Sequence, residues 1–460
     1  MNHLRARLMQ AQPDAGARLN TPQSDLALHA LAKLTGLGRV RPVLAGRNVL
    51  LRTAGQIGAA QAVVELDGLA RRIVLCPPDL APEHLGYVMR TAEVEAIVAD
   101  RADDVLLGLG ASVHTLGALD VPLALEDAPD LDTQWVLFTS GTTGRPKLVA
   151  HSLDALTGAI APRQKASDRP VWATFYDVRR YGGLQILLRA LCGGCTLALS
   201  DPAESLADHL LRLAALGVTH LTGTPSHWRR LLMGPQPPPI APAYVRLSGE
   251  IANQAVLDGL RALFPTARIV HAFASTEAGV AFEVDDGLEG FPESALSGGG
   301  PVDIKVVDGS LRIRSPRSAS GYVGPDAPAL VDDDGFIDTD DLVQLNGGRW
   351  RFMGRRNGVI NVGGLKVHPE EVEAVINRHP AVRLSVVRAR ANPITGAVVT
   401  AEVALADPLA AVSLNEQSAL RASIIAMCRS ALPAHKAPAT IRFVPEITVT
   451  GAGKLDRRHE

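Results

Sequence analysis

The segment Trp135-Val-Leu-Phe-Thr-Ser-Gly-Thr-Thr-Gly-Arg-Pro-Lys147 is the most informative stretch of this 460-residue chain. An apolar strand runs into a loop of hydroxyl and glycine residues, and the loop ends in a lysine. Glycines let backbone N–H groups approach an anion, hydroxyls add donors, and lysine adds charge. The stretch therefore predicts a polyphosphate-binding loop after a strand. Its candidate ligands are Thr139, Ser140, Gly141, Thr142, Thr143, Gly144 and Lys147.

The loop does not follow the Walker A pattern G-x-x-x-x-G-K-[ST], because Arg145 follows Gly144 and Leu148 follows Lys147. A solvated Ser/Thr/Gly turn is the plain structural alternative. The rest of the chain must therefore decide whether the loop binds a nucleotide.

Strands and helices alternate on both sides of the loop. This pattern predicts parallel βαβ units and an open α/β sheet with helices on both faces. Residues 1 to about 45 show weak periodicity and three prolines, which predicts a partly ordered lead-in. The expected helices cover 55–66, 82–91, 183–191 and 206–216, and the expected strands cover 72–76, 96–99, 135–138, 196–199, 219–221 and 268–272.

The pattern changes twice after residue 283. Short strands over 304–307, 311–313, 336–338 and 350–352 are separated by Asp-Gly and Gly-Gly pairs, which are hairpin signals. From about residue 356 a third pattern begins, and Pro369 with two following glutamates opens a helix. The last hundred residues therefore read as a separate α+β domain.

The composition excludes several classes of protein. The chain carries 46 Lys and Arg against 48 Asp and Glu, so no excess of positive charge favours nucleic acid or an anionic membrane. No apolar run reaches the roughly 20 residues of a membrane span, and the start has no signal-peptide pattern. Four scattered cysteines fit a reducing compartment. We expect a cytoplasmic globular protein.

Further motifs follow the loop in order along the chain. They are Phe273-Ala-Ser-Thr-Glu277 after a predicted strand, Asp338-Thr-Asp-Asp341, Gly354-Arg-Arg-Asn-Gly358 with Gly363-Gly364, and Thr450-Gly-Ala-Gly-Lys-Leu455 near the chain end. An aromatic face can stack on a base, and carboxylates can hold Mg²⁺ or ribose hydroxyls. A glycine-flanked lysine can stabilise developing negative charge.

Together these segments resemble the signatures of the adenylate-forming superfamily, which includes acyl-CoA synthetases, adenylation domains of peptide synthetases and luciferases. The resemblance covers nearly all of residues 48–458. It implies an α/β fold with a large N-terminal domain of α/β subdomains plus a small distorted β-barrel over 1–355, then a small mobile C-terminal α+β domain over 356–460. It also implies that ATP and a small carboxylic acid give acyl-AMP and pyrophosphate, after which CoA or a phosphopantetheinyl carrier protein accepts the acyl group.

The resemblance also implies individual roles. Lys454 would promote adenylation, Thr276 would reach the α-phosphate, and Glu277 would hold Mg²⁺. Phe273 would stack on adenine, while Asp341 and Arg355 would bind ribose or phosphate. The remaining roles are the hinge at Asn357 and the thiol-facing loop at Gly363 and Gly364.

Three of these positions depart from the family pattern. Ala274 and Asp340 stand where glycine is usual, and Asn357 stands where Asp or Lys is common. Asp is one of the residues that tolerate the positive φ a glycine would supply. The departures leave open a nucleotide-binding relative that has lost turnover.

The acyl pocket is expected from segments 174–183, 222–225 and 248–250. Tyr181 lies near the position where amino-acid-activating relatives carry Asp, which disfavours α-amino acids, although Asp177 keeps that class open. Arg179 and Arg180 are expected first as surface charges, and otherwise as partners of a polar substrate or the thiol's phosphates. The glycines favour an aryl or fatty acyl group. The pocket residues are Tyr181, Gly182, Gly223, Gly249 and Ala274.

Other functions stay open at this stage. A phosphotransferase using the γ-phosphate of ATP would release ADP instead of AMP. CoA and a carrier protein present the same thiol, so the sequence does not separate them, and it leaves open a monomer or a homodimer. His151, just after the loop, is expected to be a packing residue.

Overall fold

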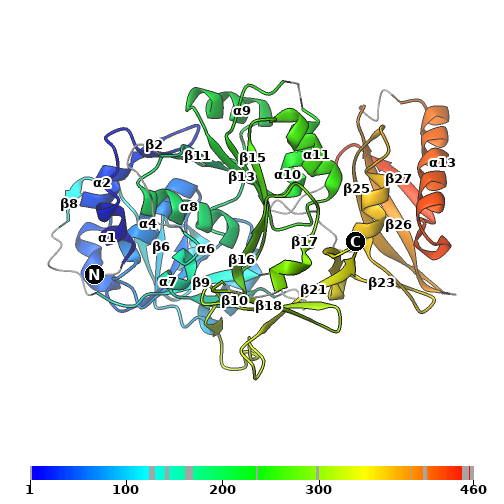
Figure 1. Cartoon of the computed structure of the whole chain (residues 1–460). Helices are drawn as coiled ribbons and strands as arrows, with labels where there is room; N and C mark the ends of the chain where they lie inside the picture. Colours follow the sequence, from blue (N-terminus) through cyan, green and yellow to red (C-terminus); the bar gives the residue numbers. More distant parts are fainter. Residues whose placement is uncertain are drawn as a thin grey trace.

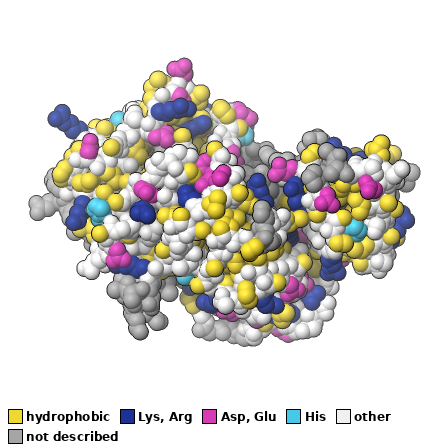
Figure 2. Space-filling model, turned by 90° about the horizontal axis from the view of Figure 1, so that it is seen from above, with side chains coloured by type: hydrophobic (Ala, Val, Ile, Leu, Met, Phe, Trp, Pro, Cys, Tyr) yellow, Lys and Arg dark blue, Asp and Glu magenta, His cyan; other side chains and the backbone are white. Residues whose placement is uncertain are grey.

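The structure, a computed structural model, describes residues 3–123, 130–139, 145–160, 169–234, 237–296, 300–393, 395–407, 412–447 and 455. It has a large body containing two mainly parallel sheets and a smaller lobe built from the C-terminal elements (Figure 1). Viewed from above, the lobe joins the body through a narrower waist (Figure 2). The α/β fold expected from the alternation of strands and helices is confirmed.

The first sheet has seven strands in the order β20-β10-β9-β5-β4-β6-β7. The strands β9, β5, β4, β6 and β7 run parallel, and β10 returns antiparallel to β9. The hairpin β9–β10 therefore brackets the predicted phosphate loop. The elements are β4 (Asn48–Arg52), α4 (Gln56–Leu66), β5 (Arg72–Leu75), α5 (Pro82–Thr91), β6 (Ala96–Ala99), α6 (Asp104–Leu107), β7 (Ser112–Thr115), β9 (Gln134–Thr139), β10 (Lys147–His151), α7 (Leu153–Thr157) and β20 (Gly321–Tyr322).

The second sheet has eight strands in the order β16-β15-β14-β13-β11-β12-β1-β2. Only the edge strands β16 and β2 are antiparallel to their neighbours. Helix α8 packs in the core between the two sheets, and α9, α10 and α11 cover the opposite face. The elements are β11 (Trp172–Thr174), α8 (Tyr181–Gly193), β12 (Leu197–Ala198), α9 (Leu206–Ala215), β13 (His220–Gly223), α10 (Pro225–Leu232), β14 (Tyr244–Ser248), α11 (Gln254–Leu263), β15 (Arg268–Ser275) and β16 (Gly279–Val284).

The lead-in is ordered, so the prediction of a partly ordered segment is wrong. Leu4, Leu8 and Leu28 are fully buried, and β1 extends the second sheet by pairing with β12. The three prolines do not prevent this order, because they lie in connections or at a helix start, where no backbone N–H is needed. The elements of the lead-in are α1 (Leu4–Gln10), β1 (Arg18–Asn20), β2 (Asp25–Ala27), α2 (Leu28–Lys33), β3 (Leu34–Thr35) and α3 (Arg41–Leu44). Strand β3 pairs with β8 (Val121–Pro122).

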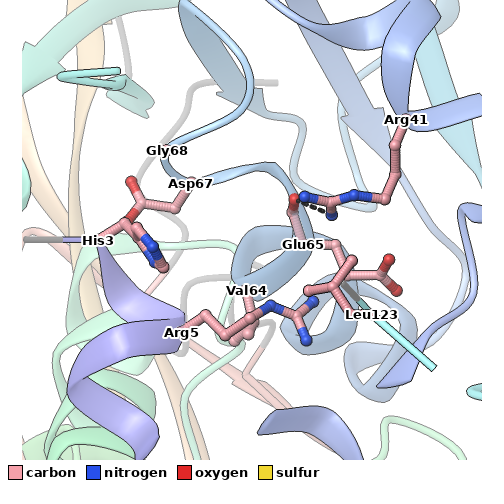
Figure 3. Close-up of a pocket in the computed structure, with 8 residues that line it drawn as sticks. All are labelled: His3, Arg5, Arg41, Val64, Glu65, Asp67, Gly68 and Leu123. Atoms are coloured by element: carbon pink, nitrogen blue, oxygen red, sulfur yellow. Dashed lines mark hydrogen bonds between the residues drawn. The ribbon is translucent and has the colours of Figure 1, made fainter. Parts of the chain in front are cut away.

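A small cavity lies where this lead-in meets α4 (Figure 3). Arg5 on its wall donates to the carbonyls of Leu31 and Leu34, and Arg41 donates to the carbonyl of Glu65. The contacts of Arg5 lie within the lead-in, and the contact of Arg41 attaches the lead-in to α4. None of the residues lining this cavity belongs to the predicted nucleotide or acyl site.

The short strands after residue 283 form a five-stranded antiparallel sheet in the order β17-β22-β21-β19-β18, where the small barrel was expected. Asp340 has a φ of 59°, as expected for an Asp in a position that usually requires glycine. The strands are β17 (Phe291–Pro292), β18 (Asp303–Val307), β19 (Ser310–Arg314), β21 (Ile337–Asn346) and β22 (Arg349–Arg355).

The C-terminal lobe has its own apolar core. Helices α12 and α13 pack on one face of the three-stranded sheet β25-β26-β27, and the hairpin β23–β24 precedes them. Pro369 at the first helical position begins α12, as predicted. The elements are β23 (Ile360–Val362), β24 (Leu365–Val367), α12 (Pro369–Ile376), β25 (Val382–Asn392), β26 (Gly396–Leu405), α13 (Leu414–Ala431) and β27 (Thr440–Val444).

Candidate nucleotide and acyl site

Tyr322 on β20 is a common neighbour of residues from separate predicted motifs. The Nζ atom of Lys147 lies 5.1 Å from the centre of the Tyr322 ring. Burial raises the pKa of the phenol to about 12, and the nearby carboxylates of Glu277 and Asp340 act in the same direction. The effect on the pKa shows that the Glu277 carboxylate lies close to the phenol. The structure thus gathers the lysine of the first motif and the glutamate of the second around one side chain.

The two ends of the predicted phosphate loop are fixed side by side, because Thr139 pairs with Lys147 across β9 and β10. Residues 140–144, which carry Ser140, Gly141, Thr142, Thr143 and Gly144, lie outside the described residues. In the described part of the chain, the buried Oγ1 of Thr139 has no hydrogen-bond partner. The guanidinium of Arg145 lies over the ring of Tyr87, 5.5 Å from the ring centre.

Phe273 and Glu277 lie at the end of β15 and in the turn that follows it. The turn is held in place because Ala319 donates its backbone N–H to the carbonyl of Glu277 at 2.8 Å. The Phe273 ring stacks on Phe282 and Phe352, with centroids 5.6 and 5.4 Å away. An adenine base would therefore have to use the rest of this half-buried ring.

His151 lies between two other predicted site residues. Its ring centre is 5.7 Å from that of Tyr181, and the ring lies near the backbone of Thr276. Among the described residues, neither ring nitrogen has a hydrogen-bond partner. Burial lowers the pKa of His151 to about 4, against a smaller opposing effect of the Thr276 backbone. The imidazole is therefore neutral at pH 7 and forms part of the buried wall between Thr276 and Tyr181.

Acid should destabilise the protein through its buried histidines. Burial lowers the pKa of both His151 and His227 to about 4 in the folded chain, against 6.5 for an ordinary histidine. Between these values the unfolded state binds more protons, so stability rises with pH and is lost as pH falls from 6.5 toward 4. Each histidine should contribute a slope of about 1.4 kcal/mol per pH unit.

Urea unfolding between pH 4.5 and 7 measures this slope. In the His151→Phe variant, the free energy of unfolding should change less steeply with pH than in the parent protein. The difference should be about the contribution of one histidine. Equal slopes for the variant and the parent protein would show that His151 does not remain neutral in the folded state.

Asp341 and Arg355 are opposite each other on β21 and β22. The Nε of Arg355 lies 3.5 Å from a carboxylate oxygen of Asp341, and its Nη2 donates to the carbonyl of Thr339 at 2.9 Å. The Thr339 hydroxyl in turn accepts the N–H of Asp341 at 3.2 Å. The two residues expected to contact ribose or phosphate are therefore adjacent and held by their strands.

Arg179 is not the surface charge that was expected. It is 3% exposed, and it forms an ion pair with Asp177 at 2.6 Å. It also donates to the carbonyl of Ala54. Asp177 is therefore already engaged within the protein and is a poor partner for a substrate ammonium. Arg180 pairs with Asp79 nearer the surface.

At two of the expected pocket positions, the backbone conformation or the packing explains why the residue is glycine. A Cβ on Gly223 would lie 2.9 Å from the Phe175 ring, so packing alone requires a small residue there. Gly249 has a φ of 86°, which favours glycine after β14. Gly182 has ordinary space, 3.5 Å from the Tyr176 ring, while Tyr181 is buried and Ala274 packs against the same core.

The predicted hinge and thiol-facing loop are exposed in this arrangement. Asn357 lies in a single 3₁₀ turn, Arg356–Gly358, directly after β22. Gly363 and Gly364 have φ of 58° and 87° and form the two-residue turn between β23 and β24. The N–H of Gly363 is bound by the carbonyl of Thr395 at 2.8 Å.

Lys454 lies outside the described residues, but the next residue is described. Leu455 is 8% exposed and packs against the sheet of the C-terminal lobe. Its backbone N–H donates to a carboxylate oxygen of Glu250 in the large body at 3.1 Å. Leu455, the residue after the predicted adenylation lysine, is therefore attached to both parts of the molecule.

The sequence reasoning missed the roles of Tyr322 and Glu250. Each becomes visible only through a contact with a segment more than forty residues away in the chain, with Glu277 and Leu455 respectively. A single tyrosine or glutamate after a glycine gives no signal of such a contact.

The described residues contain no group of three or more His, Cys, Asp or Glu side chains that could hold a metal ion. Glu277 as the single protein carboxylate fits Mg²⁺ carried on the phosphates of a nucleotide, since Mg²⁺ usually takes few protein ligands. In the described part of the chain no helix has the length and apolar character needed to cross a membrane.

Solved structures with the same fold are adenylate-forming enzymes. An anthranilate CoA ligase in complex with anthranoyl-AMP aligns over 98% of this chain and 95% of its own, with a TM-score of 0.80 at 18% identity. The ATP-bound MatB of Rhodopseudomonas palustris aligns over 98% and 96%, with a TM-score of 0.78 at 21% identity. These likenesses define the fold as that of the adenylate-forming enzymes.

The sequence profile of AMP-binding enzymes matches residues 59–323, and that of the AMP-binding enzyme C-terminal domain matches residues 371–454. The chain belongs to the AMP-binding enzyme family and is an acid-thiol ligase. It is 27% identical to the 2-succinylbenzoate–CoA ligase of Geobacillus kaustophilus, over 90% of this chain and 87% of that one. It is 29% identical to an isonitrile lipopeptide synthase of Streptomyces coeruleorubidus, over 71% of this chain but only 23% of that longer protein.

Proposed function

We propose that this enzyme activates a fatty or aryl carboxylic acid with ATP, forming acyl-AMP and pyrophosphate, and then transfers the acyl group to the thiol of CoA. The observation that carries the proposal is the convergence on Tyr322. Lys147 lies over the ring of this side chain, while Glu277, Asp340 and Arg355 lie within its electrostatic reach. Residues from four separate motifs thus surround one place.

The first half-reaction joins two anions. A carboxylate oxygen attacks the α-phosphorus, the bond to the bridging oxygen of pyrophosphate breaks, and no protein nucleophile is required. Lys147 and Lys454 would offset the phosphate charge, and Asp341 with Arg355 would orient the nucleotide. Glu277 would hold Mg²⁺, which supplies charge neutralisation when bound. Positioning and electrostatics would provide the catalysis.

The second half-reaction releases AMP. A thiol attacks the acyl carbon, the bond to the phosphate oxygen of AMP breaks, and the thiol proton leaves to solvent or a base. We propose that the C-terminal lobe turns about Asn357 between the half-reactions. Lys454 would serve the first, and the Gly363-Gly364 turn would approach the thiol in the second.

Fatty and aryl acids are favoured over α-amino acids for a structural reason. An α-amino substrate needs a carboxylate for its ammonium, and the Asp177 carboxylate is paired with the buried Arg179. Tyr181 and Ala274 add apolar surface at the predicted acyl pocket. A panel of carboxylic acids in ATP–pyrophosphate exchange tests this preference, and strong exchange with α-amino acids alone would contradict it.

A carrier protein is the second candidate acceptor. The likeness to part of an isonitrile lipopeptide synthase is the observation that favours testing it beside CoA. CoA and a holo carrier protein present the same pantetheine thiol, so the two acceptors should be compared directly on acyl-AMP formed by the enzyme. An enzyme that forms acyl-AMP but acylates neither thiol would exclude both acceptors.

The Glu277→Gln variant should lose Mg²⁺-dependent turnover by roughly 10² to 10³, because the amide keeps the size but removes the charge that would bind the ion. Its melting temperature should change little, since Glu277 is half-buried and in a turn. Rates across a Mg²⁺ titration and thermal melts on one preparation decide the matter. A large drop in melting temperature with unchanged rates would make Glu277 a structural residue.

A further inference from the structure

Glu250 connects the large body to the C-terminal lobe. It follows β14 after Gly249, whose positive φ turns the chain toward the start of α10. One carboxylate oxygen accepts the N–H of Ser226 at 2.9 Å, and the other accepts the N–H of Leu455 at 3.1 Å. One oxygen of the Glu250 carboxylate thus binds the large body, and the other binds the C-terminal segment.

The N-terminus of α10 fixes the carboxylate. Pro225 at the first helical position has no N–H, and Thr224 satisfies the N–H of His227. The Ser226 N–H is the remaining donor of this first turn, and Glu250 takes it. A carboxylate is also favoured at a helix N-terminus by the helix dipole. The large body therefore orients Glu250 independently of its contact with Leu455.

Leu455 is anchored from the opposite side. Its side chain packs with Val386 on β25, Ala404 on β26 and Ile447. These residues lie on the face of the lobe's sheet opposite the core that contains Val387 and Val403. The side chain of Leu455 thus belongs to the lobe, while its N–H binds the body.

We infer that Glu250 is a positioning residue that holds the C-terminal lobe in the adenylating arrangement. The inference rests on the proposed function, because Lys454 is the covalent neighbour of Leu455 and consecutive Cα atoms are about 3.8 Å apart. Glu250 also follows Ser248, which accepts a hydrogen bond from Tyr176 at 2.9 Å beside the predicted acyl pocket. The same short segment therefore links the acyl pocket to the position of the lysine.

The test compares Glu250→Ala and Glu250→Gln with the matched control Glu289→Gln. Glu289 also accepts an N–H at a helix start, that of Gln254 on α11 at 3.0 Å, and its recorded contacts lie within the large body. Glu250→Ala should lower acid-dependent ATP–pyrophosphate exchange at least tenfold, while thioester formation from supplied acyl-AMP stays within a few-fold. Glu250→Gln should lose less, because its amide keeps one acceptor oxygen. The control should leave both half-reactions near those of the parent.

Hydrogen exchange without substrates gives a second readout. The Leu455 amide should be protected in the parent protein and in Glu289→Gln, and it should exchange faster in Glu250→Ala. Unchanged exchange at Leu455, or an equal loss of both half-reactions, would overturn the inference. If the parent protein shows no pyrophosphate exchange with any acid, the proposed function fails, and the Leu455 amide still decides whether Glu250 holds the lobe.

Discussion

Replacing Lys454 with Ala should abolish acyl-adenylate formation, lowering ATP–pyrophosphate exchange by roughly 10² to 10³. Negative charge builds on the carboxylate and the α-phosphate as they approach, and a lysine ammonium in a water-poor site offsets it. The docking of Leu455 on Glu250 supports this role, because it ties the neighbouring residue to the large body. Thioester formation from supplied acyl-AMP should survive, since Lys454 would serve the first half-reaction only.

Lys305→Ala is a suitable control for this experiment. Lys305 lies on β18 with its Nζ 3.3 Å from Asp334, and its removal should leave both half-reactions within a few-fold. Single-turnover measurements of each half-reaction on folded protein make the comparison. Equal loss of both half-reactions in Lys454→Ala would contradict a role confined to adenylation.

Asn357→Pro should slow one half-reaction by roughly 10² or more and leave the other near that of the parent. Proline fixes φ near −65° and restricts the preceding residue, here Arg356. Asn357 is exposed and lies in a single turn between β22 and β23, so the substitution should change backbone freedom more than packing. If the lobe must turn at this residue, proline traps one of its two arrangements.

Asn357→Ala provides the matched control, because it removes the side chain and keeps the backbone free. It should perform both half-reactions within a few-fold of the parent. Pyrophosphate exchange and single-turnover thioesterification, measured separately, give the two rates. Both rates near those of the parent in Asn357→Pro would mean that the chain does not turn at this hinge.

Local signals in the sequence predicted the regular elements well. Helices α4 and α5 were expected from their periodicity, and the start of α12 from Pro369 and the two following glutamates. The positive φ of Asp340 followed from its place in a motif where glycine is usual. The helices depend on neighbouring residues, which is why one sequence was enough for them, whereas the φ of Asp340 was expected from the family resemblance.

Features that depend on distant contacts were missed. The lead-in reads as irregular, yet β1 pairs with β12 about 180 residues later, and that pairing orders it. The sequence predicts Arg179 as a surface charge, but in the fold it is buried and binds Asp177 and the Ala54 carbonyl. Phe273 was expected to offer its ring to adenine, but Phe352 from another sheet stacks on that ring. Tertiary packing decided all three outcomes.

The most direct test of the account identifies the nucleotide that the enzyme releases. Purified protein is incubated with ATP, Mg²⁺ and a panel of fatty and aryl acids, with and without CoA, and the nucleotides are separated. AMP and pyrophosphate should form in amounts that depend on the acid, and labelled pyrophosphate should exchange into ATP without CoA when the acid is present. Release of ADP and transfer of the γ-phosphate would contradict it.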